Sequence, residues 1–422
     1  MADNKQNTNP NVPNLSFKRE QSESCFDSAE RVINQKQNVP NLRFPEFTED
    51  WVTIRLGDSC DINMCKRIFA NQTSEVGDIP IYKIGTIGNI PDSYISKELF
   101  EEYKQKYNYP RKGEVLITCA GTVGKAIVFN GEDSYYQDSN IVWIDNPTNE
   151  LDNTFLYYKI NCVDWSKLNS TTITRIYNDD LRKLKISYPS IAEQIKISKL
   201  LQVLDQRIAT QNKIIEDLKK LKVAISQVCF EQKPIDEIPL HKFFKKGKAG
   251  GTPTSTNKEY YDGEIPFLSI NDITEQGKYI YSTEKHLSEK GLLNSSAWVV
   301  PVNSLILSMY ASVGLTTINK IPLATSQAMF SMELKEPELI DYLYYYLTYF
   351  KYRYIHRYLE TGTQSNINAD IVRSIKIPNY GKSKNIEMSA MLANIDKKIE
   401  IENIYIQSLL SQKAYLLSNM FI

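Results

Sequence analysis

Four lysines lie within the eight residues HKFFKKGK, just before a Gly-rich bend at residues 250 and 251. Ammonium groups attract phosphate, and the amides of a loop can add hydrogen-bond donors. This segment, with Lys242, Lys245, Lys246 and Lys248, is therefore a candidate phosphate-binding surface. A solvated surface turn explains the same residues equally well. The matching segment NMCKR at residues 63–67 shows a weaker form of the pattern.

Two polar segments at matching positions could contact the edges of nucleic-acid bases. Their candidate residues are Thr172, Thr174, Arg175 and Asn178 in the first segment and Thr363, Gln364, Ser365 and Asn366 in the second. Asn and Gln can form two hydrogen bonds with adenine, and Arg can do so with guanine. The alternative is a capping and turn role before the next strand.

Two loops rich in small residues follow predicted strands, CAGTVGK at 119–125 and MYASVG at 309–314. Each loop could face a groove of a nucleic acid, or it could be an ordinary β-turn. The candidate contacts in these loops and at matched strand ends are Lys83, Thr86, Lys125, Ser269, Asn271 and Tyr310.

Residues 342–358 contain eight tyrosines, a side chain that stacks well on exposed bases. The equivalent stretch 155–158 (FLYY) is also aromatic, and helix packing explains a repeated aromatic stripe more simply. We therefore predict a buried helix here. The exceptions are Arg353, His356 and Arg357, which could contact phosphate.

The motifs of common catalytic sites are missing. There is no N-P-P-Y or D-P-P-Y to hold a target adenine, and GTVGK lacks the spacing of a Walker loop. The three histidines are too scattered for an evident acid–base pair. The six cysteines include no C-x-x-C pair, which argues for reduced thiols rather than zinc. We expect no catalytic residue, no cofactor and no metal site.

The charge balance excludes one class of binding. The chain has 50 basic and 50 acidic residues, so it cannot hold nucleic acid by bulk positive charge alone. Any such binding must be local or shared with a partner. No apolar run is long enough to span a membrane, so we expect a cytoplasmic protein with no membrane contact. Residues 1–38, rich in Asn and Gln, are expected to be disordered.

An internal repeat is the most informative feature. Residues 200–230 align without a gap on residues 391–421, an offset of 191 residues. The same offset joins Ile176 to Ile367 upstream. Each copy starts with short strand-like runs such as ITCAG and LILSM and ends in a long helix-like segment. The sequence thus predicts an α+β fold with two globules, at 39–190 and 231–380, and two long helices, at 191–230 and 381–422.

Five heptads in each long helix indicate a coiled-coil seam, although a helix lying on its own globule is the alternative. Parallel pairing would place Lys222 against Lys413. Antiparallel pairing places Lys222 opposite Glu402 and Gln211 opposite Lys413, so we predict this direction and register within one chain. Such helices, about 55–60 Å long, would hold the globules at opposite ends about a pseudo-twofold axis. Ile422 should then lie near residue 41.

Several segments resemble the specificity subunit of type I restriction-modification systems. They are VPNLRFPEFTEDW (39–51), GGTPTSTNKEYYDGEIPFLSINDI (250–273), RIYNDDLRKLKISYPSIAEQ (175–194) and GTQSNINADIVRSIKIPN (362–379). The resemblance covers nearly everything from residue 39 to 422, because motif order, repeat and helices agree. The Asn/Gln-rich tail and its second copy of NVPNL depart from the family pattern.

The resemblance implies a non-catalytic reader of double-stranded DNA. Two target-recognition domains would each read one half of a split, asymmetric site. The long helices would separate these domains and dock two methyltransferase subunits, similar in kind to adenine-N6 enzymes. Motor-nuclease subunits would join them to cut unmodified DNA. With one turn of B-DNA at about 34 Å, the two domains could address successive major grooves.

Two other classes of function remain open from the sequence. One is an interaction scaffold, in which the coiled coil joins two protein-binding modules with no DNA role. The other is an enzyme with an unrecognised nuclease site.

Overall fold

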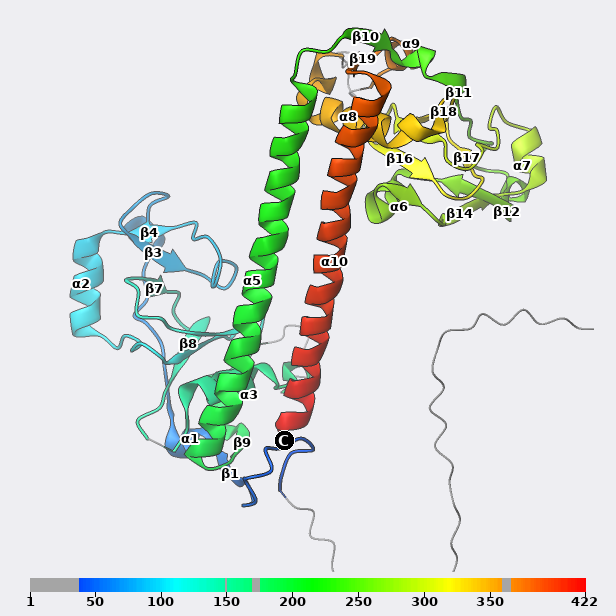
Figure 1. The fold of residues 1–422 in the computed structure, drawn as a ribbon. Helices are drawn as coiled ribbons and strands as arrows, with labels where there is room; N and C mark the ends of the chain where they lie inside the picture. Colours follow the sequence, from blue (N-terminus) through cyan, green and yellow to red (C-terminus); the bar gives the residue numbers. More distant parts are fainter. Residues whose placement is uncertain (1–37, 149, 169–174, 359–365) are drawn as a thin grey trace, which may run out of the picture.

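The computed structural model describes residues 38–148, 150–168, 175–358 and 366–422. Two long helices, α5 (Ile191–Phe230) and α10 (Lys382–Met420), lie side by side and run in opposite directions (Figure 1). One globule lies against the lower part of this helix pair in the figure. The other lies at the upper end, so that the two globules are held apart.

The described residues of the first globule form three small sheets, in which the strand orders are β2-β8-β5-β6, β4-β3-β7 and β1-β9. Its strands are β1 (Val52–Arg55), β2 (Asp61–Asn63), β3 (Ile79–Tyr82), β4 (Tyr94–Ile95), β5 (Val115–Thr118), β6 (Ala126–Val128), β7 (Tyr135–Tyr136), β8 (Ile141–Asp145) and β9 (Lys185–Tyr188). Its helices are α1 (Leu56–Ser59), α2 (Lys97–Lys106), α3 (Asn153–Asn161) and α4 (Asn178–Lys183).

The second globule repeats this arrangement with the strand orders β11-β18-β15-β16-β13, β14-β12-β17 and β10-β19. Its strands are β10 (Asp236–Pro239), β11 (Phe244–Ala249), β12 (Tyr261–Leu268), β13 (Tyr279–Ile280), β14 (Lys285–Leu287), β15 (Leu305–Ser308), β16 (Thr316–Asn319), β17 (Ala324–Thr325), β18 (Met329–Leu334) and β19 (Lys376–Asn379). Its helices are α6 (Ile270–Gln276), α7 (Glu289–Leu293), α8 (Ile340–Arg353) and α9 (Ala369–Ser374).

The repeat predicted from the sequence is therefore present in the topology. In each globule the apolar runs form the larger sheet, and its central strand, β5 or β15, is buried at every residue. A strand that is covered on both faces reads as a nearly continuous apolar run, and LILSM contains all of β15. The predicted run ITCAG shares only Ile117 and Thr118 with β5, and its other residues belong to the loop that follows. The mixed fold of helices and strands agrees with the α+β prediction.

Each globule has the end of one long helix in its core. Phe421, after α10, packs in the first globule against Phe155 of α3, with ring centroids 5.1 Å apart. Phe230, at the end of α5, packs in the second globule against Tyr346 of α8 at 5.4 Å. Because the long helices contribute to both cores, the globules are not independent of the helix pair. The predicted burial of the tyrosine-rich helix is confirmed for most of α8, where Tyr342 is fully buried. Tyr352, near the end of this helix, is 77% exposed.

The register of the helix pair differs from the prediction. Lys222 pairs with Asp396 at 2.5 Å and Lys413 pairs with Asp205 at 2.5 Å, rather than with Glu402 and Gln211. Gln211 instead donates its amide to the Glu402 carboxylate. The expected polar pairs are thus wrong, although the opposite direction of the helices is as expected.

The physical reason is that the two lysines do not need a partner at a heptad position of the facing helix. Their long side chains reach aspartates at the flank of the seam, where a quarter of each lysine side chain stays exposed. Gln211 and Glu402 occupy equivalent positions of the repeat, so they meet on the pseudo-twofold axis. A Gln–Glu pair avoids the repulsion that two carboxylates would have there.

Glu402 gives the helix pair a pH dependence. Its pKa is lowered from 4.5 by the hydrogen bonds from Lys398 and Gln211. A depressed pKa in the folded state contributes stability above the unfolded pKa, and this contribution is lost as the pH falls through the folded value. We expect Glu402→Gln to lose less stability than the wild type between about pH 6 and about pH 3. Urea midpoints across this range test it, and parallel curves for the two proteins would contradict it.

The chain closes on itself at its C-terminal helix. The backbone amide of Leu42 donates to the Asn419 carbonyl at 2.8 Å, which agrees with the expectation that Ile422 lies near residue 41. Next to it, Arg43 forms a two-pronged ion pair with the buried Glu193 in the first turn of α5, at 2.7 and 2.8 Å. The N-terminal segment thus ties the start of α5 to the end of α10.

Candidate nucleic-acid interface

The two small-residue loops singled out from the sequence are built alike. After β5, Gly124 donates its amide to the Thr118 carbonyl at 2.8 Å, and after β15 Gly314 does the same with Ser308 at 2.8 Å. Both glycines have a left-handed φ, +81° and +80°. An added Cβ at Gly124 would collide with the Trp165 ring, so glycine is required there both by φ and by space.

Two further segments hold each of these loops. In the first globule, the Cys119 amide donates to the Asn140 carbonyl at 2.7 Å, and the Ile176 amide donates to the Cys119 carbonyl at 2.9 Å. In the second globule, Met309 bonds in the same two ways to Ala328 (2.7 Å) and Ile367 (3.0 Å). The fold thereby brings Arg175 beside the first loop and Asn366 beside the second.

Three candidates of the first globule meet around the turn at residues 83–89. The Lys125 ammonium donates to the Ile87 carbonyl at 2.6 Å. Lys83 donates to Asp92 at 3.0 Å and to the Ser93 hydroxyl at 2.6 Å, and the Thr86 hydroxyl accepts from the Lys83 amide. These side chains stabilise the turn, so a phosphate near Lys83 would compete with the Asp92 carboxylate.

Arg175, which lies beside the first loop, contacts the turn at residues 138–140. Its guanidinium donates to the Ser139 carbonyl at 3.2 Å and lies 5.8 Å from the ring centroid of Tyr177. Ser139 has a left-handed φ of 50°. Asn178 is the first residue of α4 and is half-buried. Thr172 and Thr174 lie outside the described residues.

Three lysines of the cluster in the second globule, Lys245, Lys246 and Lys248, lie on β11, the edge strand of the five-stranded sheet, and Lys242 precedes this strand. Lys245 pairs with Glu333 at 2.8 Å, and the Lys246 ammonium lies 4.1 Å from the ring centroid of Trp298. Lys248 is exposed. The cluster is therefore a solvated surface in which one of the three candidate charges is neutralised by an internal partner.

The other candidates of the second globule differ in their roles. Ser269 is the N-cap of α6, because its hydroxyl accepts from the Asp272 amide and donates to the Asp272 carboxylate. Asn271 is exposed, and Tyr310 is 39% exposed. Asn366 is half-buried beside Met309. Thr363, Gln364 and Ser365 lie outside the described residues.

One contact in the first globule was not singled out from the sequence. Arg67 of the NMCKR segment pairs with Asp138 at 2.7 Å while 60% of its side chain stays exposed. Arg67 and Arg175 therefore both contact the 138–140 turn. The basic residues of NMCKR were a weak signal for this arrangement, because the sequence did not show which distant turn they would meet.

The described residues contain no features of metal or membrane sites. No group of three or more His, Cys, Asp or Glu side chains in this part of the chain could hold a metal ion. None of the helices formed by these residues is long and apolar enough to cross a membrane. The thiols of Cys60, Cys65, Cys119, Cys162 and Cys229 are free, and burial raises the pKa of the Cys119 thiol to about 11. Cys25 lies outside the described residues.

Comparisons with known proteins identify the family. The family model described as "Type I restriction modification DNA specificity domain" matches residues 48–220 and again residues 233–411. A Haemophilus influenzae protein named as a type I restriction enzyme specificity subunit is 52% identical over 165 residues, which cover 39% of this chain and 42% of that protein. This match thus spans less than half of either chain.

Two further relatives extend over most of the length. A Methanocaldococcus jannaschii protein named as the MjaX specificity subunit is 24% identical over 410 residues, covering 87% of this chain and 92% of its own. The crystal structure of a type I restriction-modification S subunit from M. genitalium has a TM-score of 0.58 at 17% identity, covering 91% of this chain and 99% of its own, and shows the shared fold.

With both copies of its repeat matched to one family model, the chain belongs to the type I restriction modification DNA specificity family and is a specificity subunit, the non-catalytic DNA-recognition component of such a system.

Proposed function

We propose that the chain reads a bipartite, asymmetric DNA site. The globule at 39–190 reads one half, the globule at 231–380 reads the other, and the helix pair acts as a coiled-coil spacer between them. The observation that carries this proposal is the pair of loops at 119–125 and 309–314. They share one backbone construction but differ in the side chains around them.

The difference is clearest at residues 175 and 366, which are equivalent in the repeat. The first is Arg and the second is Asn, and each precedes the isoleucine that bonds to its loop. Arginine pairs best with guanine, whereas asparagine pairs best with adenine. Two similar scaffolds that present different side chains suit a site whose halves differ in sequence.

Contacts with phosphate would position the globules without reading sequence. Lys246 and Lys248 on the edge strand β11 supply exposed charge in the second globule, and Arg67 supplies it in the first. The net charge of zero supports a division of labour, in which partner subunits contribute much of the nonspecific attraction to DNA.

The helix pair offers a surface for those partners. A groove of about 530 Å³ runs between α5 and α10 and is lined mainly by apolar side chains, which include Leu218, Leu221 and Ile395, together with Glu387, Asn394 and Lys398. Val223 and Ile404 add apolar surface, with 68% and 65% exposure. Amphipathic helices of a partner fit such grooves. We assign this role to two methyltransferase subunits, which methylate adenine, with motor-nuclease subunits joining them to restrict unmodified DNA.

The proposal is tested by purification from the native host followed by selection from a pool of random DNA duplexes. We expect methyltransferase subunits to co-purify. The complex should enrich one split sequence, whereas the chain alone should bind weakly and in a salt-sensitive manner. Equal affinity of the complex for all sequences would refute the proposal. Purification with other partners would favour a scaffold, and metal-dependent cleavage by the isolated chain would favour a nuclease.

Single substitutions should relax one half-site each. Arg175→Ala should lower discrimination at one base pair of one half-site, and Asn366→Ala should do so in the other half. The expected loss is about 1–3 kcal/mol of discrimination for each. Competition binding by the complex measures it. Lys106→Ala is the control, because Lys106 pairs with Glu102 on α2 at the outer edge of the first globule (Figure 1). Relaxation of both halves by one substitution would contradict the assignment.

A further inference from the structure

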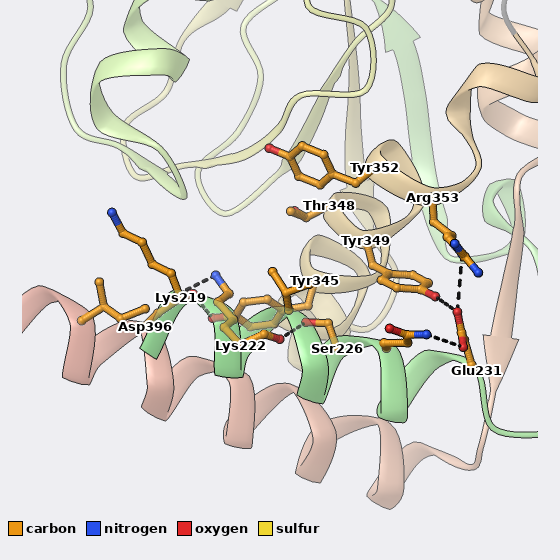
Figure 2. Close-up of a pocket in the computed structure, with 13 residues that line it drawn as sticks. Lys219, Lys222, Ser226, Glu231, Tyr345, Thr348, Tyr349, Tyr352, Arg353 and Asp396 are labelled. Carbon is orange, nitrogen blue, oxygen red and sulfur yellow. Dashed lines mark hydrogen bonds and ion pairs between the residues drawn. The ribbon is translucent and has the colours of Figure 1, made fainter. Parts of the chain in front are cut away.

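Each globule is joined to the helix pair by the same three residue types. At the first joint, the Tyr158 hydroxyl of α3 donates to one Asp205 oxygen at 2.7 Å, and Lys413 of α10 pairs with the other oxygen at 2.5 Å. At the second joint, Tyr345 of α8 donates to Asp396 at 2.7 Å, and Lys222 of α5 pairs with the other oxygen at 2.5 Å. Figure 2 shows Lys222 and Asp396 together with Tyr345.

Each joint therefore connects three elements at one carboxylate. The aspartate belongs to the long helix that follows its own globule, the tyrosine to the globule, and the lysine to the opposite long helix. Lys413 and Lys222 also lie over the tyrosine rings, at 5.8 and 5.3 Å from the centroids. Rotation of the globule would break the tyrosine bond, and sliding of the helices would break the lysine bond.

The apolar contacts around the joints do not fix the orientation of the globules relative to the helix pair. Phe421 packs on α3 and Phe230 packs on α8, and such burial favours contact without fixing an angle. Hydrogen bonds to a charged group are short and directional. Burial and the neighbouring aspartate both raise the pKa of the Tyr158 and Tyr345 hydroxyls, so these hydroxyls remain donors at neutral pH.

The second joint carries an additional cation. Lys278 donates to the Tyr345 hydroxyl at 3.0 Å, pairs with Asp341 at 2.8 Å, and lies 4.4 Å from the centroid of the Tyr345 ring. The groove beside this joint, about 710 Å³ and lined by Lys222 and Asp396, leaves the network open to solvent on one side. The side chains of this network are thus held by several partners while one side of the network remains accessible to solvent.

We infer that these two Tyr–Asp–Lys joints set the angle between each globule and the helix pair, and thereby determine which spacer length between the half-sites the chain accepts. This inference rests on the proposed function. One base pair more or less moves a half-site by about 3.4 Å along the axis and rotates it by about 35°. A globule that is free to turn at its joint can follow this change, whereas a fixed globule cannot. Tyr158 and Tyr345 are then positioning residues that contact no DNA.

The test compares Tyr158→Phe/Tyr345→Phe with a matched control, Tyr109→Phe/Tyr346→Phe. The control removes two partly buried hydroxyl bonds that lie within a globule, from Tyr109 to the Ser134 carbonyl (2.7 Å) and from Tyr346 to the Lys376 carbonyl (2.9 Å). Phenylalanine keeps the ring packing in all four positions. Both variants are assayed as full chains with the methyltransferase subunits.

Methylation rates are measured on duplexes with the selected half-sites and the preferred spacer, or with one base pair more or fewer. We expect the joint variant to lose about tenfold of its discrimination against the altered spacers, because a hydrogen bond to a charged group contributes about that much. Half-site selectivity should not change, and the control should behave as the wild type.

A readout without DNA complements this assay. Spin labels on encoded non-natural residues at positions 106 and 289, on α2 and α7, report the distance between the globules. The distribution should broaden in the joint variant only. A wild type with no spacer or sequence preference would show that the proposed function is wrong. A selective wild type with a joint variant that matches the control in both measurements would overturn this inference alone.

Discussion

Replacement of Arg43 by alanine is expected to lower the free energy of unfolding of the first globule by about 3–5 kcal/mol. The guanidinium forms two bonds to the Glu193 carboxylate, whose side chain has no exposed surface. The hydrogen bonds to Glu193 raise the pKa of Arg43, so the guanidinium stays charged. Removing only the arginine leaves a buried carboxylate without its partner, and this desolvation dominates the loss.

Urea denaturation followed by tryptophan fluorescence measures this effect, because three of the four tryptophans (Trp51, Trp143 and Trp165) lie in the first globule. Lys196→Ala is a matched control. Lys196 pairs with Glu46 across the same two segments, but both side chains are about half exposed, so the expected loss is about 1 kcal/mol or less. A loss of that size for Arg43→Ala would contradict the role of the pair. The double variant Arg43→Met/Glu193→Leu should recover most of the stability.

Exchange of residues 39–190 for those of a related specificity subunit is expected to change one half of the recognised sequence and to leave the other half intact. Each mismatched base pair costs about 1–3 kcal/mol, so a half-site with several changes should lose about 10³-fold or more in affinity. The donor has to keep the aromatic residue at 155 and the tyrosine at 158, because these contact Phe421 and Asp205. Selection from random duplexes by the hybrid complex measures the outcome.

A hybrid that changes both halves would show that the globules do not read independently. A hybrid in which Tyr158 is also replaced by phenylalanine separates the two effects. It should accept the same new half-site and differ only in the spacer lengths that it tolerates.

The sequence predicted the parts of the fold that depend on local periodicity and on the repeat. The run LILSM became the central strand β15, ITCAG marked only the end of β5, and most of the aromatic stripe at 342–358 formed the largely buried helix α8. The offset of 191 residues correctly related the contacts of Ile176 and Ile367. These features could be predicted because burial on one or both faces leaves a pattern in the chain itself.

The helix register could not be predicted from the same information. Seam positions alone allowed Lys222 to be matched with Glu402, whereas the structure pairs Lys222 with Asp396. Asp396 also accepts from Tyr345 of the second globule, so the register depends on a contact outside the helix pair. Heptad analysis does not include such a contact. The internal partners of the candidate site, Asp92 for Lys83 and Glu333 for Lys245, are likewise contacts that periodicity does not encode.

The central claim is tested most directly by mapping methylated adenines in the genome of a host. The host expresses the methyltransferase subunits either with this chain or without it. We predict methylation at a single motif of two defined parts that are separated by an unspecified spacer of constant length, and no methylation at that motif without the chain. Methylation of one uninterrupted motif, of motifs with variable spacers, or of the same motif in the absence of the chain would contradict the claim that two globules held apart by the helix pair each read half a site.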